Sequence, residues 1–277
     1  MPTEKVINLA ERRHEKNPFR KRELYIVGGE HCLSRLDPKQ AKDFVNLEMG
    51  LIEMIALRKR CTGFFEDGMS KEDAGFFNRL IANLEASDGP GQERMLEHLW
   101  EGEEKADGYG AALSIEMMAG IRKAGIRISY LPMEEPFDAL GILEGKIPFE
   151  EFDILLGVME NAINDLGEEE GREMLRSIIH GNQQYWELLM RERDPTIFGN
   201  VSKYAEERNI MLIGRDHLLD DFRKKKHNFE VRRVDLVEGA PGVIQMRGSM
   251  PPSLKPIFDS LGRQNAGLEV QVTFSDT

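Results

Sequence analysis

Two short apolar runs in this chain end in the same pattern of glycine and histidine. One is Leu24–His31, with the sequence LYIVGGEH, and the other is Ile210–His217, with the sequence IMLIGRDH. Each pattern predicts a buried strand that ends at glycine and places a histidine just beyond its C-terminal end. Open α/β sheets bind their ligands at that edge. Two histidines, each beside a carboxylate, are therefore the first candidates for a functional site.

The rest of the chain alternates between strand and helix patterns. Apolar runs at 62–65, 126–131, 229–234 and 268–274 predict strands, and helical periodicity covers 38–60, 70–86, 92–106, 109–123 and 149–193. We therefore expect an α/β fold with a mostly parallel central sheet flanked by helices. The Gly- and Pro-rich segment 239–252 predicts a loop, and Arg193-Asp194-Pro195 predicts the start of a new helix.

No segment has the composition of a linker, so we expect residues 1–277 to form a single α/β domain. The mainly helical stretch at about 68–125 is expected to be an insertion in that domain or a cap over the sheet.

Charge and composition exclude several classes of protein. The chain has 49 acidic and 37 basic side chains, a net charge of -12, which disfavours general nucleic-acid binding. No apolar run approaches the ~20 residues of a membrane span. The polar N-terminus lacks the apolar core of a secretory signal, so we expect a cytoplasmic protein. The oligomeric state is left open.

Carboxylates follow the predicted strands. Glu66 follows the second strand, and Glu134 and Glu135 follow the third. Together with Glu30, His31 and His217, they are expected to meet at one edge of the sheet. Glutamate and histidine in a cleft can bind a divalent metal ion, or act as a general base and its partner. His31, Glu66 and His217 are the metal candidates; the alternative is that they are ordinary polar loop residues.

A third element is the pair Arg193-Asp194, followed by Asn200 in the next helix. One interpretation is a salt-bridged helix cap. The other is that the guanidinium of Arg193 points into the cleft and holds an anionic group or a catalytic carboxylate.

These motifs together resemble those of the erythromycin esterase, ChaN and TraB/TIKI superfamily. The resemblance covers about Leu24 to Asp235 and is carried by Gly28-Gly29-Glu30-His31, Glu66, Arg193-Asp194 with Asn200, and Gly214-Arg215-Asp216-His217. It implies a parallel-sheet core with a cleft at the strand ends. Some members hydrolyse esters, TIKI proteins resemble metal-dependent peptidases, and ChaN binds haem. The missing export signal or anchor argues against haem scavenging and Wnt cleavage.

By position, the resemblance makes His31, Glu66 and His217 the centre of the site, with Glu30, Arg193 and Asp194 in support. We expect a hydrolase that acts on a small or medium ester or amide, including peptides. His31 or His217 would activate water, directly or on a divalent metal ion. Two alternatives are a non-catalytic module that binds haem or a metal ion, and a regulatory protein with an inactive site.

Overall fold

The centre of the protein is a seven-stranded sheet. The computed structural model describes residues 21–29, 38–87, 89–105, 111–134, 139–214, 217, 229–238, 243–249 and 269–274. The strands are β1 (Arg22–Gly29), β2 (Gly63–Glu66), β3 (Ser129–Leu131), β4 (Arg208–Gly214), β5 (Phe229–Glu238), β6 (Val243–Ser249) and β7 (Glu269–Phe274), in the order β3-β2-β4-β1-β5-β6-β7. Strands β1 to β5 are parallel, and β6 runs antiparallel to β5. The predicted α/β class is confirmed.

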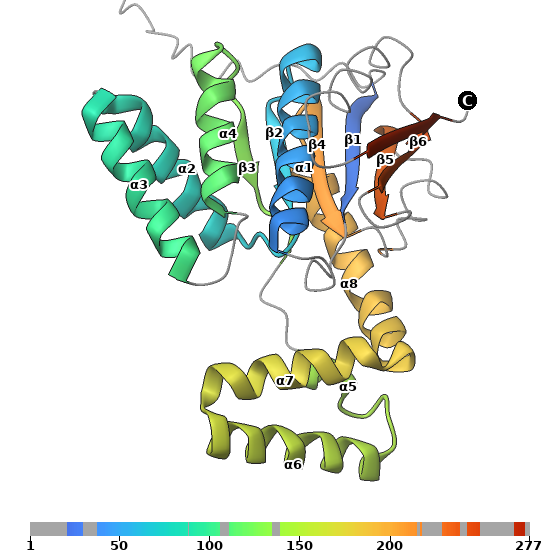
Figure 1. Cartoon of the computed structure of the whole chain (residues 1–277). Helices are drawn as coiled ribbons and strands as arrows, with labels where there is room; N and C mark the ends of the chain where they lie inside the picture. Colours follow the sequence, from blue (N-terminus) through green and yellow to red (C-terminus); the bar gives the residue numbers. More distant parts are fainter. Residues whose placement is uncertain are drawn as a thin grey trace, which may run out of the picture.

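Helices cover both faces of this sheet. They are α1 (Pro38–Lys59), α2 (Lys71–Ala86), α3 (Gly89–Lys105), α4 (Ala111–Lys123), α5 (Ala139–Leu143), α6 (Phe149–Leu166), α7 (Glu168–Gly181) and α8 (Gln183–Tyr204). In Figure 1, α1 lies in front of the strands and α8 passes behind them. None of the described helices is both long and apolar enough to cross a lipid bilayer.

The two apolar runs with the glycine–histidine pattern form neighbouring strands. β1 and β4 pair in parallel, and Gly29 of β1 is directly opposite Gly214 of β4. Leu24–Val27 and Ile210–Met211 are almost completely buried, as expected for strands covered by helices on both faces. Both runs therefore end at the same level of the sheet.

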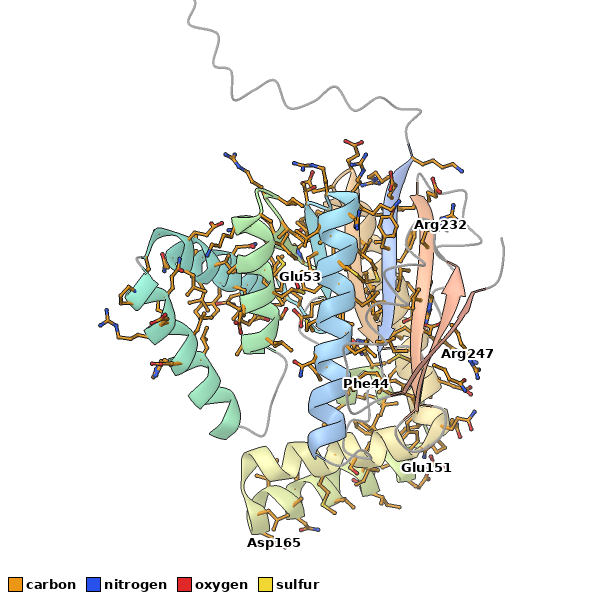
Figure 2. The ribbon with its side chains drawn as sticks, turned by 45° about the horizontal axis from the view of Figure 1, so that its top comes forward. Phe44, Glu53, Glu151, Asp165, Arg232 and Arg247 are labelled. Carbon is orange, nitrogen blue, oxygen red and sulfur yellow. The ribbon has the colours of Figure 1, made fainter. Side chains whose placement is uncertain are left out.

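The described helices belong to two apolar cores. Residues of α1, α2, α4 and the last half of α8 share one core with the strands, so the helices of the 68–125 segment pack with the sheet. A second cluster is built by residues 139–190 alone. Figure 1 shows α6 and α7 beyond the sheet, on the side toward which β4 and β5 point. Glu151 and Asp165 mark the two ends of α6 in Figure 2.

Two predictions from the sequence were wrong. Segment 239–252 was expected to be a loop, but β6 lies within it and pairs with β5. A new helix was expected at Arg193-Asp194-Pro195, but α8 continues through Pro195. Proline has no N–H to donate, so the helix is interrupted in its hydrogen bonding rather than ended.

Replacing Gly248 tests the pairing of β5 with β6. A Cβ atom at this position would lie 2.0 Å from the backbone oxygen of Arg233, which a side-chain rotation cannot relieve. We expect Gly248→Ala to lower the free energy of unfolding by about 2 kcal/mol or more in urea denaturation. Gly157→Ala is the control, because nothing lies within 4 Å of its Cβ position in α6. That change should stabilise the helix by up to about 1 kcal/mol. Equal stability of the two variants would contradict the pairing.

Candidate functional site

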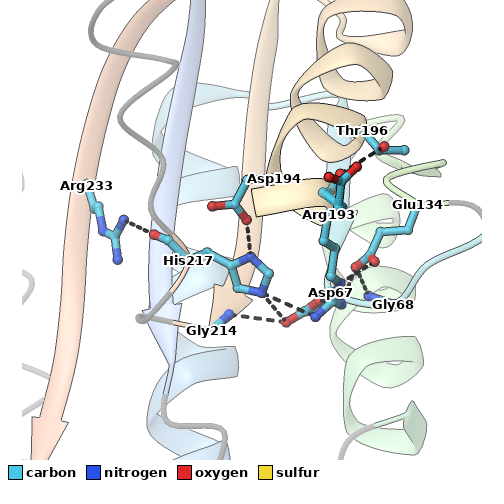
Figure 3. A network of polar contacts seen from close by, with 10 residues as sticks. Asp67, Gly68, Glu134, Arg193, Asp194, Thr196, Gly214, His217 and Arg233 are labelled. Atoms are coloured by element: carbon cyan, nitrogen blue, oxygen red, sulfur yellow. Dashed lines mark hydrogen bonds and ion pairs between the residues drawn. The ribbon is translucent and has the colours of Figure 1, made fainter. Parts of the chain in front are cut away.

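The second histidine pattern and the Arg-Asp pair meet at the C-terminal edge of the sheet. His217 follows β4, and its Nδ1 lies 2.7 Å from Oδ1 of Asp194 in α8. Its Nε2 lies 3.4 Å from Nη1 of Arg193 and 3.7 Å from Oδ2 of Asp67. The His217 side chain is 0% exposed, so both of its ring nitrogens face protein groups (Figure 3).

Arg193 connects carboxylates from two strand ends. Its Nε donates to Oε2 of Glu134 and its Nη2 to Oε1, both at 2.6 Å. The same Nη2 donates to Oδ1 of Asp67 at 2.5 Å. Asp67 follows β2, and Glu134 follows β3. A planar guanidinium has the fork of donors that such two-point binding needs.

Backbone contacts fix both carboxylates. The amide of Gly68 donates to Oε1 of Glu134 at 2.8 Å, and the amide of Gly214 donates to Oδ2 of Asp67 at 3.3 Å. Asn200 donates to the carbonyl oxygen of Met133 at 3.2 Å and so holds the segment that carries Glu134. The asparagine of the predicted Arg-Asp…Asn helix therefore has a positioning role.

The pKa values of Glu134 and Arg193 are shifted by burial and by their mutual contacts. It raises the pKa of Glu134 above its usual value; the hydrogen bonds from Arg193 oppose that change, and the neighbouring Asp67 adds to it. Burial disfavours the charge on Arg193, but Glu134 and Asp67 outweigh it and raise the pKa of the guanidinium. Arg193 is thus always charged, and Glu134 holds its proton to a higher pH than an exposed glutamate.

Glu66 points to a different set of neighbours from Asp67. The hydroxyl of Ser114 donates to its Oε2 at 3.2 Å, and Ser114 is 2.6 Å from the hydroxyl of Tyr130. Both acids nevertheless line one cavity of about 250 Å³. Asp67 is therefore the residue that links this cavity to His217.

Two more carboxylates lie against the end of β1. A Cβ atom on Gly29 would be 2.0 Å from Oε1 of Glu48, and one on Gly28 would be 2.0 Å from Oδ1 of Asp235. Carboxylates from α1 and β5 thus approach the glycine pair closely. Glu30 and His31 lie outside the described residues, so their part in the site stays a prediction.

Sequence reasoning named four members of this cluster and missed Asp67. Arg193, Asp194 and His217 were all predicted, and the structure brings them together. Asp67 was missed, although it directly follows Glu66 and precedes a glycine turn with positive φ at Gly68. Glu134 was expected at this edge of the sheet, but its pairing with Arg193 was not predicted.

The predicted metal set of His31, Glu66 and His217 stays a prediction, because His31 lies outside the residues that the structure describes. Within them, no group of three or more His, Cys, Asp or Glu side chains is arranged to hold a metal ion. His217 contacts Asp194, Asp67 and Arg193, whereas Glu66 contacts Ser114.

Comparisons with known proteins do not assign a family. No family model and no curated protein matches this chain. Among solved structures, it is similar to ChaN of Campylobacter jejuni, in a structure described as showing cofacial heme binding. The similarity covers 79% of this chain and 83% of that chain, with 11% identity and a TM-score of 0.39. At this level the superfamily resemblance stays a prediction.

The raised pKa of Glu134 predicts how stability depends on pH. An acid whose pKa is higher in the folded than in the unfolded chain stabilises the fold at low pH, and this contribution is lost as the pH rises through the folded-state pKa. The free energy of unfolding of the wild type, relative to Glu134→Gln, should therefore fall with rising pH. Urea denaturation between about pH 4 and pH 8 measures it. If the free energy of unfolding of the wild type, relative to Glu134→Gln, instead rose with pH, attraction to Arg193 would outweigh the effect of burial on the pKa of Glu134.

Proposed function

We propose that this protein is a hydrolase in which His217 and Asp67 activate water at the cavity beside β2. The observation that carries this proposal is the 2.7 Å contact between His217 and Asp194. An ionised carboxylate only accepts hydrogen bonds, so Nδ1 of His217 carries a proton, and the lone pair of the neutral imidazole is then on Nε2. Nε2 is thus the basic atom, and Asp194 stabilises the imidazolium that forms when it takes a proton.

Asp67 provides the path from the cavity to this base. Its carboxylate lines the cavity and lies 3.7 Å from Nε2 of His217. In the proposed step, a water in the cavity loses a proton to Asp67, and the proton moves on to Nε2. The water oxygen bonds to the acyl carbon of an ester or amide. The proton then returns to the leaving oxygen or nitrogen as its bond to carbon breaks.

Arg193 acts as a positioning residue in this proposal. Its donors contact Glu134, Asp67 and His217, and so hold the three groups in one geometry. The positive charge also offsets the repulsion between Asp67 and Glu134, which is strong in a partly buried setting. Of the two cleft roles that the sequence suggests for Arg193, its contacts with Asp67 and Glu134 support that of holding a catalytic carboxylate.

The binding alternative fits the described residues less well. Haem ligation by His217 would require its Nε2 to leave Arg193 and Asp67, in a side chain that is 0% exposed. We therefore do not include haem in the proposed step.

Hydrolysis of p-nitrophenyl acetate tests the proposal. We expect His217→Gln and Asp67→Asn to lower kcat/KM by about 10²–10⁴-fold, because each removes a proton acceptor. Glu192→Gln is the matched control. Glu192 directly precedes Arg193, and its side chain is 53% exposed and pairs with Lys146. The control should keep its activity within about twofold, since exposed pairs contribute little. A wild type no faster than His217→Gln would contradict the proposal for small esters.

Haem titration separates the two function classes. If His217 is an acid–base group, added haem should give the same Soret band with the wild type and with His217→Gln. A band that the wild type shows and the variant loses would instead make His217 a haem ligand.

A further inference from the structure

The segment at about 68–125, expected from the sequence to be an insertion or a cap, forms part of the cavity beside β2. Its helix α2 contributes Asp73 and Phe77 to the lining. Its helix α4 carries Ser114, which contacts Glu66 in the same lining. The segment therefore helps to build the candidate site.

Two buried hydroxyl groups lead from α4 and β3 to Glu66. Ser114 and Tyr130 are both almost completely buried. The Oγ of Ser114 donates to Oε2 of Glu66 at 3.2 Å, and it lies 2.6 Å from the hydroxyl of Tyr130. A serine hydroxyl has a single proton, so Ser114 gives this proton to Glu66 and accepts from Tyr130. The hydrogen bonds thus run in one direction, from Tyr130 through Ser114 to the carboxylate.

Tyr130 is well placed to begin this chain of hydrogen bonds. Burial and the charge of Glu66 raise the pKa of Tyr130, so its hydroxyl keeps the proton that it donates. The backbone amide of Tyr130 donates to Oδ1 of Asn78 in α2, and its carbonyl accepts from Nδ2, both at 2.9 Å. Its ring packs on Phe64 and Phe77, with 5.3 Å and 5.5 Å between ring centroids. Both backbone and ring contacts therefore fix the position of the hydroxyl.

Packing alone does not require these two hydroxyls. Alanine in place of Ser114 and phenylalanine in place of Tyr130 would fill nearly the same space without burying polar groups. Replacing both partners of a buried hydrogen bond by apolar groups of the same shape costs little stability. A hydrogen bond to a charged carboxylate, in contrast, is short, strong and directional. The benefit of the two hydroxyls therefore lies in the orientation of Glu66.

We propose that Ser114 and Tyr130 are positioning residues that hold Glu66 so that its carboxylate and that of Asp67 bind the attacking water together. The inference rests on the proposed hydrolase, in which Asp67 takes a proton from that water. Both acids line the cavity, and a carboxylate can accept several hydrogen bonds. A water that donates one hydrogen to each acid has its oxygen lone pairs directed away from them, toward the substrate.

The proton balance of the proposed step is unchanged by this arrangement. The water gives up only the hydrogen that it donates to Asp67. The hydrogen that it donates to Glu66 stays on the oxygen that bonds to the acyl carbon. Glu66 thus orients the water without taking part in the transfer of the proton.

The double variant Ser114→Ala/Tyr130→Phe tests the positioning role in the full-length protein. We expect kcat for p-nitrophenyl acetate to fall about 10–100-fold while KM stays within about twofold, because a misoriented water slows the chemical step and leaves binding of the ester unchanged. The midpoint of urea denaturation should change little, since both hydroxyls are removed together.

Tyr25→Phe/Ser202→Ala is the matched control. Tyr25 is a buried tyrosine whose hydroxyl donates to Glu23 at 2.5 Å, and Oγ of Ser202 is buried without a hydrogen-bond partner among the described residues. Neither residue lines the cavity, so the control should keep kcat within about twofold. If His217→Gln loses activity but Ser114→Ala/Tyr130→Phe keeps the kcat of the wild type, the positioning role is overturned and the hydrolase is kept.

Crystal structures of the wild type and the double variant give a readout that does not depend on activity. The wild type should hold an ordered water within about 3.2 Å of both carboxylates. In the double variant, Glu66 should adopt another rotamer and this water should be lost. That result, together with no hydrolysis by the wild type, would overturn the hydrolase and keep the water site. An unchanged Glu66 in both crystals, or no water between the two acids in the wild type, would overturn the inference itself.

Discussion

The guanidinium of Arg193 is the interaction on which the arrangement at this sheet edge depends. It joins Asp67 and Glu134, which follow neighbouring strands, and it contacts His217, which follows a third. Without a cation between them, two partly buried carboxylates would repel each other and lose much of their hydration. A lysine could supply the charge but not the planar fork that binds Glu134 through two nitrogens. The geometry of the site therefore depends on this side chain.

The site also divides into a buried and an open part. His217 and Asp194 are closed off from solvent, whereas Glu66 and Asp67 line a cavity. Asp67 is common to both parts. Such a division lets a base keep a fixed orientation in a dry setting while the substrate exchanges with water a short distance away.

Much of the fold, and about half of the described cluster, could be predicted from the sequence. β1 and β4 were predictable because their apolar runs stop at glycines, and Arg193, Asp194 and His217 because their motifs are local. β6 was not, since its pairing with β5 depends on register between strands. Asp67, and the pairing of Glu134 with Arg193, were not predicted because only the tertiary fold brings these carboxylates to Arg193. Glu66 and Asp67 are adjacent in sequence, yet their carboxylates face different neighbours.

Helix α8 belongs to both apolar cores, and this has a consequence for folding. Its first half packs with the helices of residues 139–190 and its second half with the sheet, and Arg193 and Asp194 lie where the two halves meet. Residues 139–190 therefore cannot be deleted as a unit, because the deletion would remove half of the helix that carries Arg193 and Asp194. Since the site draws on positions from Asp67 to His217, it is complete only after most of the chain has reached its native topology.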